Sequence, residues 1–179
     1  SAAKIDPELK VASLNQDVGL LPSFEAPASK QNTFSFPRLD ISVALYHMDE
    51  PLPQAQRADR VLLEKGARLL HLFDGDQLVK SYRIDLGFSP VGHKQVEGDG
   101  KTPEGDYRID WRKKDSEFYR ALHISYPSEQ DASIAKFSGR DPGGAIMIHG
   151  RPNGFSDNDP LAADWTAGCI AVKNAAIEE

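Results

Sequence analysis

From about residue 60 onward, the sequence consists of short apolar runs separated by turn-forming residues. The runs are RVLLEK, ARLLHLF, QLVKSYRIDLG, GDYRID, ALHISY, AIMIHG and CIAV. In the third run Tyr82, Ile84 and Leu86 fall on one face, which is the alternation of a half-buried strand, and Asp74-Gly75 predicts a tight turn before it. The pattern therefore predicts a mainly β domain, a β-rich α+β fold with a few short helices.

Three segments carry helix signals instead. Ser128 and Asp131 have the spacing of a capping pair for a helix that runs through Phe137. A second helix begins at Asn174 and breaks off within two turns. Since so short a helix is marginal without a packed sequel, we expect the domain to continue in the natural protein. Near the N-terminus, DPE (residues 6–8) predicts a short helix to about residue 19.

The N-terminal third differs from the rest of the chain. LPSFEAPASKQNTFSFPR is rich in proline and serine, which is typical of a loop or linker, and ISVALYHM is compatible with either a strand or a helix start. We therefore divide the chain into an N-terminal helical extension and linker, residues 1–55, and a domain of residues 56–179. A length of 179 residues suits one domain with a core and an extension.

Charge and composition exclude several classes of protein. The net charge is −6 and no short segment gathers lysine and arginine, so we expect no nucleic-acid partner. No apolar run has the length needed to cross a bilayer, and the opening SAAKIDPELK carries no signal-peptide pattern, although it is compatible with a processed terminus. A single cysteine cannot form an internal disulfide or a Cys-x-x-Cys pair.

The single cysteine, Cys169, follows Gly168 and begins an apolar run, while His149 ends another apolar run twenty residues earlier. A lone cysteine is most often inert core packing. A glycine turn would instead expose the sulfur at the start of a strand, and a histidine at the end of a neighbouring strand would be its base. Such a pair predicts a thiol that ionises below the usual value of about 8.5. At this point both interpretations stay open.

Five blocks, in order, resemble the YkuD-type L,D-transpeptidase catalytic domain, in its YafK-like Gram-negative branch. They are KSYRIDLGFSPVGHK, GDGKTPEGDY, LHISYP, DPGGAIMIHG and DWTAGCIAVKN, and with their surroundings they span about two thirds of the chain. The resemblance implies a YkuD-like β-sandwich or barrel. It also implies a catalytic dyad in which Cys169 is the nucleophile and His149 is the base.

The same resemblance suggests roles for the residues around the dyad. Gly150 follows the histidine, and its carbonyl group is expected to orient the imidazole. Thr166 and Gly168 are expected to form the turn that presents the sulfur, and the amides of Gly168 and Cys169 are the candidates for an oxyanion hole. Ordinary turn chemistry is an equal alternative for Thr166 and Gly168.

This chain departs from the common family pattern at two positions. Many members have SHGC with an arginine two residues after the cysteine, whereas this chain has Ala167 and Ala171 there. That arginine is expected to bind a substrate carboxylate or to support the site, so its role needs another residue here. The candidates for that role are Arg151, Arg140, Lys94 and His93.

Two further residues are candidates for the substrate-binding surface. His123 lies in the middle of a predicted strand, and the alternatives are a position facing the site or one in the core or behind the site. Trp165 is expected to stack on substrate or to form a wall beside the cysteine. Residues 157–159 suggest a solvated, flexible lid. The histidines and Cys169 lack compact metal-ligand spacing, so we predict no metal and no cofactor.

The resemblance implies an exported acyl-enzyme of the bacterial cell envelope or periplasm. Cys169 would attack the L-centre carbonyl of meso-diaminopimelate in a peptidoglycan stem peptide, and an amine or water would resolve the thioester. One alternative is a hydrolase that cleaves diaminopimelate–lysine links between peptidoglycan and a lipoprotein. Another, of a different class, is a catalytically silent peptidoglycan-binding module. The sequence leaves the oligomeric state open.

Overall fold

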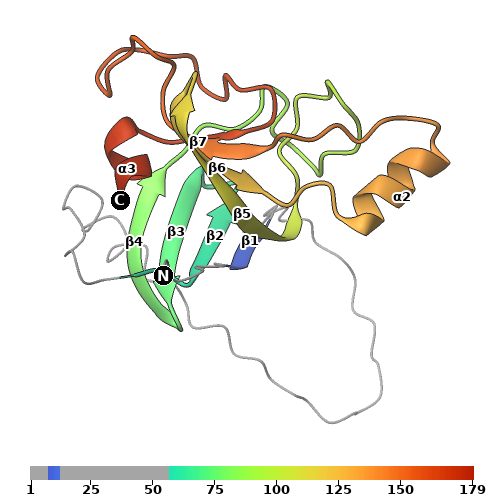
Figure 1. The fold of residues 1–179 in the computed structure, drawn as a ribbon, viewed down its shortest axis with the longest axis horizontal. Coiled ribbons are helices and arrows are strands. Elements are labelled where there is room, and N and C mark those ends of the chain that lie inside the picture. The colour runs from blue at the N-terminus through green and yellow to red at the C-terminus, as the bar shows by residue number, and fades with distance from the viewer. Residues whose placement is uncertain (1–7, 13–56) are drawn as a thin grey trace, which may run out of the picture.

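The structure, a computed structural model, describes residues 8–12 and 57–179. Short strands alternate with long connections, and the only described helices lie in the C-terminal third (Figure 1). In chain order the elements are β1 (Glu8–Ala12), β2 (Arg60–Glu64), β3 (Leu69–Asp74), β4 (Gln77–Arg83), β5 (Gly105–Ser116), β6 (Tyr119–Ile124), α2 (Glu129–Phe137), β7 (Met147–His149), β8 (Ile170–Ala171) and α3 (Asn174–Glu178).

The strands are hydrogen-bonded in the order β4-β3-β2-β1-β5-β6-β7-β8. The two ends of this order are also joined, because the chain beyond β4 pairs with the region of β8. Asp85 and Ala171 exchange N–H···O bonds of 2.9 and 2.8 Å, Thr166 donates to Leu86, and Phe88 donates to Thr166. The sheet thereby closes on itself. This confirms the predicted mainly β, barrel-like class, and most of the predicted runs are strands.

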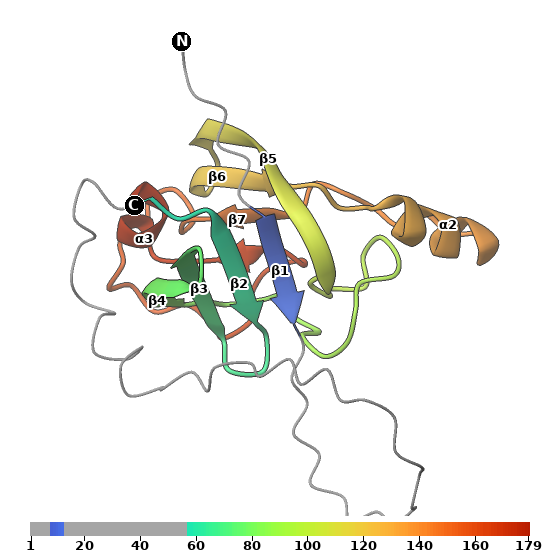
Figure 2. The same cartoon turned by 90° about the horizontal axis from the view of Figure 1, so that it is seen from below.

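Strand β1 corrects the N-terminal prediction. The helix expected from residue 6 to about residue 19 is wrong for Glu8–Ala12, which pairs in parallel with β2 and antiparallel with β5. Figure 2 shows β1 between these two strands. Strand pairing overrides the local capping signal, because a strand here pairs backbone groups that β2 and β5 would otherwise leave unpaired at an edge. Residues 13–19, the linker and ISVALYHM lie outside the described residues, so the division at residue 55 stays a prediction.

Helix α2 has the predicted cap and the predicted end. The Ser128 side chain accepts from the Asp131 N–H at 3.2 Å, and the Asp131 carboxylate accepts from the Ser128 N–H at 2.9 Å. This reciprocal capping box satisfies two donors that the first helical turn leaves unpaired, and the helix ends at Phe137 as expected. Neither described helix is long and apolar enough to cross a membrane.

Helix α3 begins where the sequence predicts, but its cap comes from a distant residue. The Asp157 carboxylate accepts from the backbone N–H groups of Asn174 and Ala175 at 2.6 and 3.0 Å. An acidic side chain at a helix N-terminus is favourable because the first N–H groups have no intrahelical partner. The predicted lid segment is therefore tied to α3 at Asp157, although Asn158 and Asp159 are exposed as expected.

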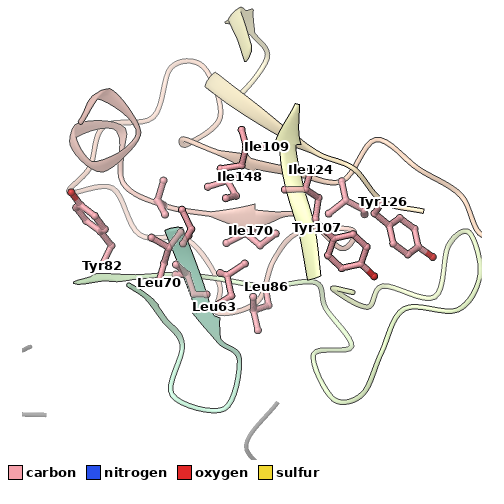
Figure 3. Packing of buried hydrophobic residues seen from close by; sticks show 14 residues of the cluster. Leu63, Leu70, Tyr82, Leu86, Tyr107, Ile109, Ile124, Tyr126, Ile148 and Ile170 are labelled. Atoms are coloured by element: carbon pink, nitrogen blue, oxygen red, sulfur yellow. The ribbon is translucent and has the colours of Figure 1, made fainter. Parts of the chain in front are cut away.

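The hydrophobic core fills the inside of the closed sheet (Figure 3). Both halves of the sheet contribute to it, and Leu63, Leu86, Ile124 and Ile170 have no exposed surface. Its other members are Val61, Leu70, Tyr82, Ile84, Tyr107, Ile109, Tyr126, Ile146, Ile148 and Val172. Because Ile148 of β7 and Ile170 of β8 point into this core, their sequence neighbours project from the opposite face.

The buried ammonium group of Lys65 joins the end of β2 to two loops. The Nζ of Lys65 donates to the carbonyls of Gly92 and Thr102, both at 2.7 Å, and to the Glu104 carboxylate at 2.9 Å. Burial lowers the pKa of Lys65, and the Glu104 carboxylate opposes this shift. The end of β2 is thereby held against the two loops that carry the GHK and TPEG sequences.

Candidate active site

The pairing of β7 with β8 brings His149 and Cys169 together. In this parallel pair Ile148 lies opposite Ile170 and His149 lies opposite Ala171. Since side chains alternate along a strand, His149 and Cys169 both project from the face opposite the core. The strand spacing and the rise per residue place their Cα atoms roughly 8 Å apart.

His149 is held in one orientation. Its Nδ1 lies 2.7 Å from the Gly150 carbonyl oxygen, which can only accept, so Nδ1 carries the proton and Nε2 carries a lone pair. This is the contact expected of Gly150. The imidazole is buried, with Phe118 at 4.5 Å and Trp165 at 5.6 Å between ring centroids. Burial lowers the pKa of His149, so the ring is a neutral base at pH 7.

The thiol of Cys169 is only partly accessible. Its Sγ lies 3.7 Å from the carbonyl oxygen of Ala145, to which the S–H donates. Burial raises the pKa of Cys169, while a backbone hydrogen bond from Met147 and the charge of Lys94 act in the opposite direction. The raised pKa contradicts the expectation of a thiol that ionises unusually early. The directions of the two pKa shifts instead favour a neutral thiol at Cys169 and a neutral imidazole at His149.

Thr166 and Gly168 build the turn that presents the sulfur. The Thr166 hydroxyl donates to the Cys169 carbonyl at 2.7 Å and accepts from the Gly168 N–H at 3.1 Å. The Gly168 amide is therefore occupied, which removes it from the predicted oxyanion hole. The Cys169 amide makes no hydrogen bond within the described part of the chain, so it stays the candidate donor for an oxyanion.

His93, a candidate for substrate binding, has both ring nitrogens engaged by the protein. Its Nδ1 accepts from the Glu104 N–H at 2.9 Å, and its Nε2 donates to the Asp131 carboxylate at 2.9 Å. Asp131 is also the capping residue of α2. His93 thus connects the TPEG turn to that helix, and its role in substrate binding stays a prediction.

The remaining cationic candidates differ in position. Lys94 is buried, its Nζ donates to Val96 O at 2.9 Å and to Asp99 at 3.0 Å, and its charge acts on the sulfur. The Arg151 guanidinium donates to the Asp159 carbonyl and lines a cavity beside Trp165. Arg140 follows α2, and its backbone N–H closes that helix. Lys94 and Arg151 are therefore the candidates that the fold brings to the dyad.

His123 lies on the same strand face as His149. It lies opposite Met147 across β6 and β7, on the face that carries His149. Its Nδ1 donates to Asp110 at 2.6 Å, and its ring stacks on Trp111 with centroids 4.8 Å apart. Of the two alternatives, the core position is therefore excluded, and the side chain is fixed by neighbours on β5.

Two aromatic rings flank the imidazole. Trp165 was a candidate from the sequence and forms a wall beside His149. Phe118, which lies between β5 and β6, covers another part of the same ring and also contacts Trp165 at 5.7 Å between centroids. The sequence gives no signal for Phe118, because it lies in none of the matching blocks and far from His149 along the chain.

Comparison with known proteins gives one family. Residues 58–179 match the family model of the L,D-transpeptidase catalytic domain, YkuD. The YafK protein of Escherichia coli (strain K12) is 34% identical over 105 residues, which are 58% of this chain and 36% of that protein. A second YafK, from Escherichia coli O157:H7, matches over the same lengths. The chain therefore spans little more than a third of the curated relatives it matches.

Two solved structures are also similar to this chain. The helical cell shape determining protein Pgp2 (K307A mutant) from Campylobacter jejuni is 31% identical, with a TM-score of 0.49 over 64% of this chain and 39% of that one. Bd1075 of Bdellovibrio bacteriovorus is 27% identical, with a TM-score of 0.45 over 66% of this chain and 41% of that one.

Proposed function

The chain belongs to the L,D-transpeptidase catalytic domain family, and on this premise we propose that it is a cysteine acyl-enzyme acting on peptidoglycan in the cell envelope. Its substrate would be a stem peptide that contains meso-diaminopimelate. The observation that carries the proposal is the register of β7 and β8, which sets Cys169 and His149 on one face. The Gly150 carbonyl supports it, because it leaves the lone pair of Nε2 available as a base.

In the proposed reaction, Nε2 of His149 takes the thiol proton as Sγ of Cys169 attacks the L-centre carbonyl of diaminopimelate. The oxyanion that forms accepts a hydrogen bond from the Cys169 amide. The imidazolium then gives its proton to the departing nitrogen, the C–N bond breaks, and a thioester remains. An amine or a water molecule attacks the thioester, loses its proton to the neutral imidazole, and the thiol leaves with that proton.

Covalent labelling tests whether Cys169 acylates. The four-membered ring of a carbapenem presents a strained amide carbonyl, so we expect the wild-type chain to gain the mass of one carbapenem and Cys169→Ala to gain none. The measurement is intact mass after incubation at pH 7. A wild-type chain that is folded yet never gains mass would refute the acyl-enzyme and favour the silent peptidoglycan-binding module.

A second candidate function is hydrolysis, which the two alanines beside the nucleophile favour. Ala167 is exposed and Ala171 is buried next to His149, so neither position carries a polar side chain that would hold an acceptor amine. Transfer requires an oriented amine, because positioning supplies much of the rate of such a step. Water needs no such orientation. Under this alternative the chain cleaves diaminopimelate amides, among them links between diaminopimelate and a lysine of a lipoprotein.

Product analysis separates transfer from hydrolysis. For a defined muropeptide whose diaminopimelate L-centre carbonyl is amide-bonded, we expect cleavage at least comparable with transfer to an added diaminopimelate-bearing acceptor. Mass spectrometry of the products with and without the acceptor gives the ratio, and Cys169→Ala should abolish both. Cross-linked dimer with negligible cleaved product would refute hydrolysis and leave the dyad assignment standing.

A further inference from the structure

A cavity of about 320 Å³ lies beside the dyad, along β8. Trp165 and Ala171 form part of its wall, and both also adjoin His149, the first by ring contact and the second as its strand partner. The lining continues through Val172 and Lys173, which follow Ala171 in the chain. The cavity therefore extends from the imidazole in the direction away from Cys169.

The walls of this cavity are strongly cationic. Arg68, Arg83, Arg151 and Lys173 line it, together with one carboxylate, that of Asp85. Arg68 is neutralised by Asp164 through two bonds of 2.8 and 2.7 Å. The other three cations make no ion pair within the described part of the chain. In a protein with a net charge of −6, this is a local excess of positive charge.

Arg151 carries a further sign of an incomplete site. Its Nε is buried and makes no hydrogen bond within the described residues, although its guanidinium also donates to the Asp159 carbonyl. A buried donor without a partner is destabilising, so such groups usually face an acceptor when the site is filled. The acceptor that suits a guanidinium is a carboxylate or another oxyanion.

We propose that this cavity binds a carboxylate on the leaving-group side of the substrate, with Arg151 and Arg83 as its main partners. The inference rests on the proposed function. In that reaction His149 protonates the departing nitrogen, and the cavity adjoins His149 on the side away from the sulfur. The amino acid that departs with the nitrogen therefore lies toward the cavity. The short side chain of Ala171 leaves this space open.

The test compares two ligands that differ only in charge. Both are stem peptides in which a single amino acid is amide-bonded to the L-centre carbonyl of diaminopimelate. In one peptide this amino acid ends in a free carboxylate, and in the other it ends in a carboxamide. Binding to the full chain carrying Cys169→Ala, which cannot turn the peptides over, is measured by calorimetry at fixed salt. We expect the carboxylate form to bind at least about tenfold more tightly, because charge-assisted hydrogen bonds are the strong ones.

Arg151→Gln and Arg83→Gln, each added to Cys169→Ala, should reduce this preference to about threefold or less, because each substitution weakens binding of the carboxylate more than binding of the carboxamide. Lys136→Gln, in the last turn of α2, removes an exposed charge outside the cavity and should keep the preference. Arg83 is exposed at the end of β4, so its variant stays informative if Arg151→Gln unfolds.

Three other outcomes would contradict the proposed carboxylate site, and one of them would also count against the proposed function. Equal binding of the two peptides, or a preference that survives both arginine substitutions, would overturn the carboxylate site alone. Binding of neither peptide to the folded Cys169→Ala chain would overturn the carboxylate site and count against the proposed substrate as well.

Discussion

His149→Ala is expected to slow the acylation of Cys169 by a carbapenem about 10²–10⁴-fold at pH 7. Burial raises the pKa of the thiol, so little thiolate is present and the proton must be removed during attack. Nε2 of His149 is the base that we propose for this step, since the Gly150 carbonyl keeps the proton on Nδ1. The rate is followed by intact mass, with thermal unfolding as the check that the variant is folded.

The pH profile should separate a base from a merely structural residue. Burial lowers the pKa of His149 below its usual 6.5, so the wild-type ring stays neutral and the rate flat through neutral pH, with a fall only in more acidic solution. Without the imidazole, the rate depends on the thiolate fraction. It should therefore rise about tenfold per pH unit up to the raised pKa of the thiol.

Chemical rescue gives a second readout for the same variant. Removing the imidazole leaves a space between the rings of Phe118 and Trp165, which flank it in the wild type. Free imidazole added to His149→Ala should occupy that space and recover part of the lost rate. A variant within a few-fold of the wild type at every pH, and indifferent to imidazole, would refute the assignment of His149 as the base.

Local sequence patterns predicted the strands of the domain well, because their turns are encoded locally. Asp74-Gly75 and Lys65-Gly66 end strands as expected, and Gly75 has a φ of 56°, which glycine adopts without strain. Strand β1 could not be predicted in this way. Its conformation depends on the edges of β2 and β5, which lie far along the chain, and that pairing overrides a local capping signal.

The sequence indicates the two groups of the proposed dyad but not their electrostatics. Spacing and motif indicate Cys169 and His149, whereas the pKa of each group depends on which distant residues cover it. Phe118 buries the imidazole from a part of the chain that carries no motif. The same limit applies to His93, whose partners Glu104 and Asp131 become its neighbours only in the fold, and to the cationic cavity beside Ala171.

Among single changes near the sulfur that leave His149 and Cys169 in place, Gly168→Ala is expected to cause the largest loss of stability. Gly168 has a φ of 133°, a conformation that L-residues rarely adopt, and a Cβ there would lie 2.7 Å from the Lys101 carbonyl oxygen. The backbone strain costs about 1–3 kcal/mol and the overpacking a similar amount, so we expect a loss of about 2–5 kcal/mol in the free energy of unfolding. Urea denaturation measures this loss.

Gly154→Ala is the matched control for this prediction. Gly154 also has a positive φ, 91°, but a Cβ there would meet no atom within 4 Å, so its variant reports backbone strain without a clash. Equal losses of stability in the two variants would show that the contact with Lys101 is relieved at no cost, and would refute this account of the turn.

The effect of Gly168→Ala on acylation should exceed its effect on stability. The chain near Gly168 is tightly packed, because Gly87 also lies against it: a Cβ at Gly87 would lie 2.9 Å from the Gly168 Cα. A shift of the turn that relieves the clash with Lys101 also moves Cys169, the next residue in the chain. A displacement of about 1 Å at the nucleophile can cost about 10²-fold in rate. We thus expect the carbapenem adduct to form at least 10²-fold more slowly in Gly168→Ala, measured well below its unfolding midpoint, and at the wild-type rate in Gly154→Ala.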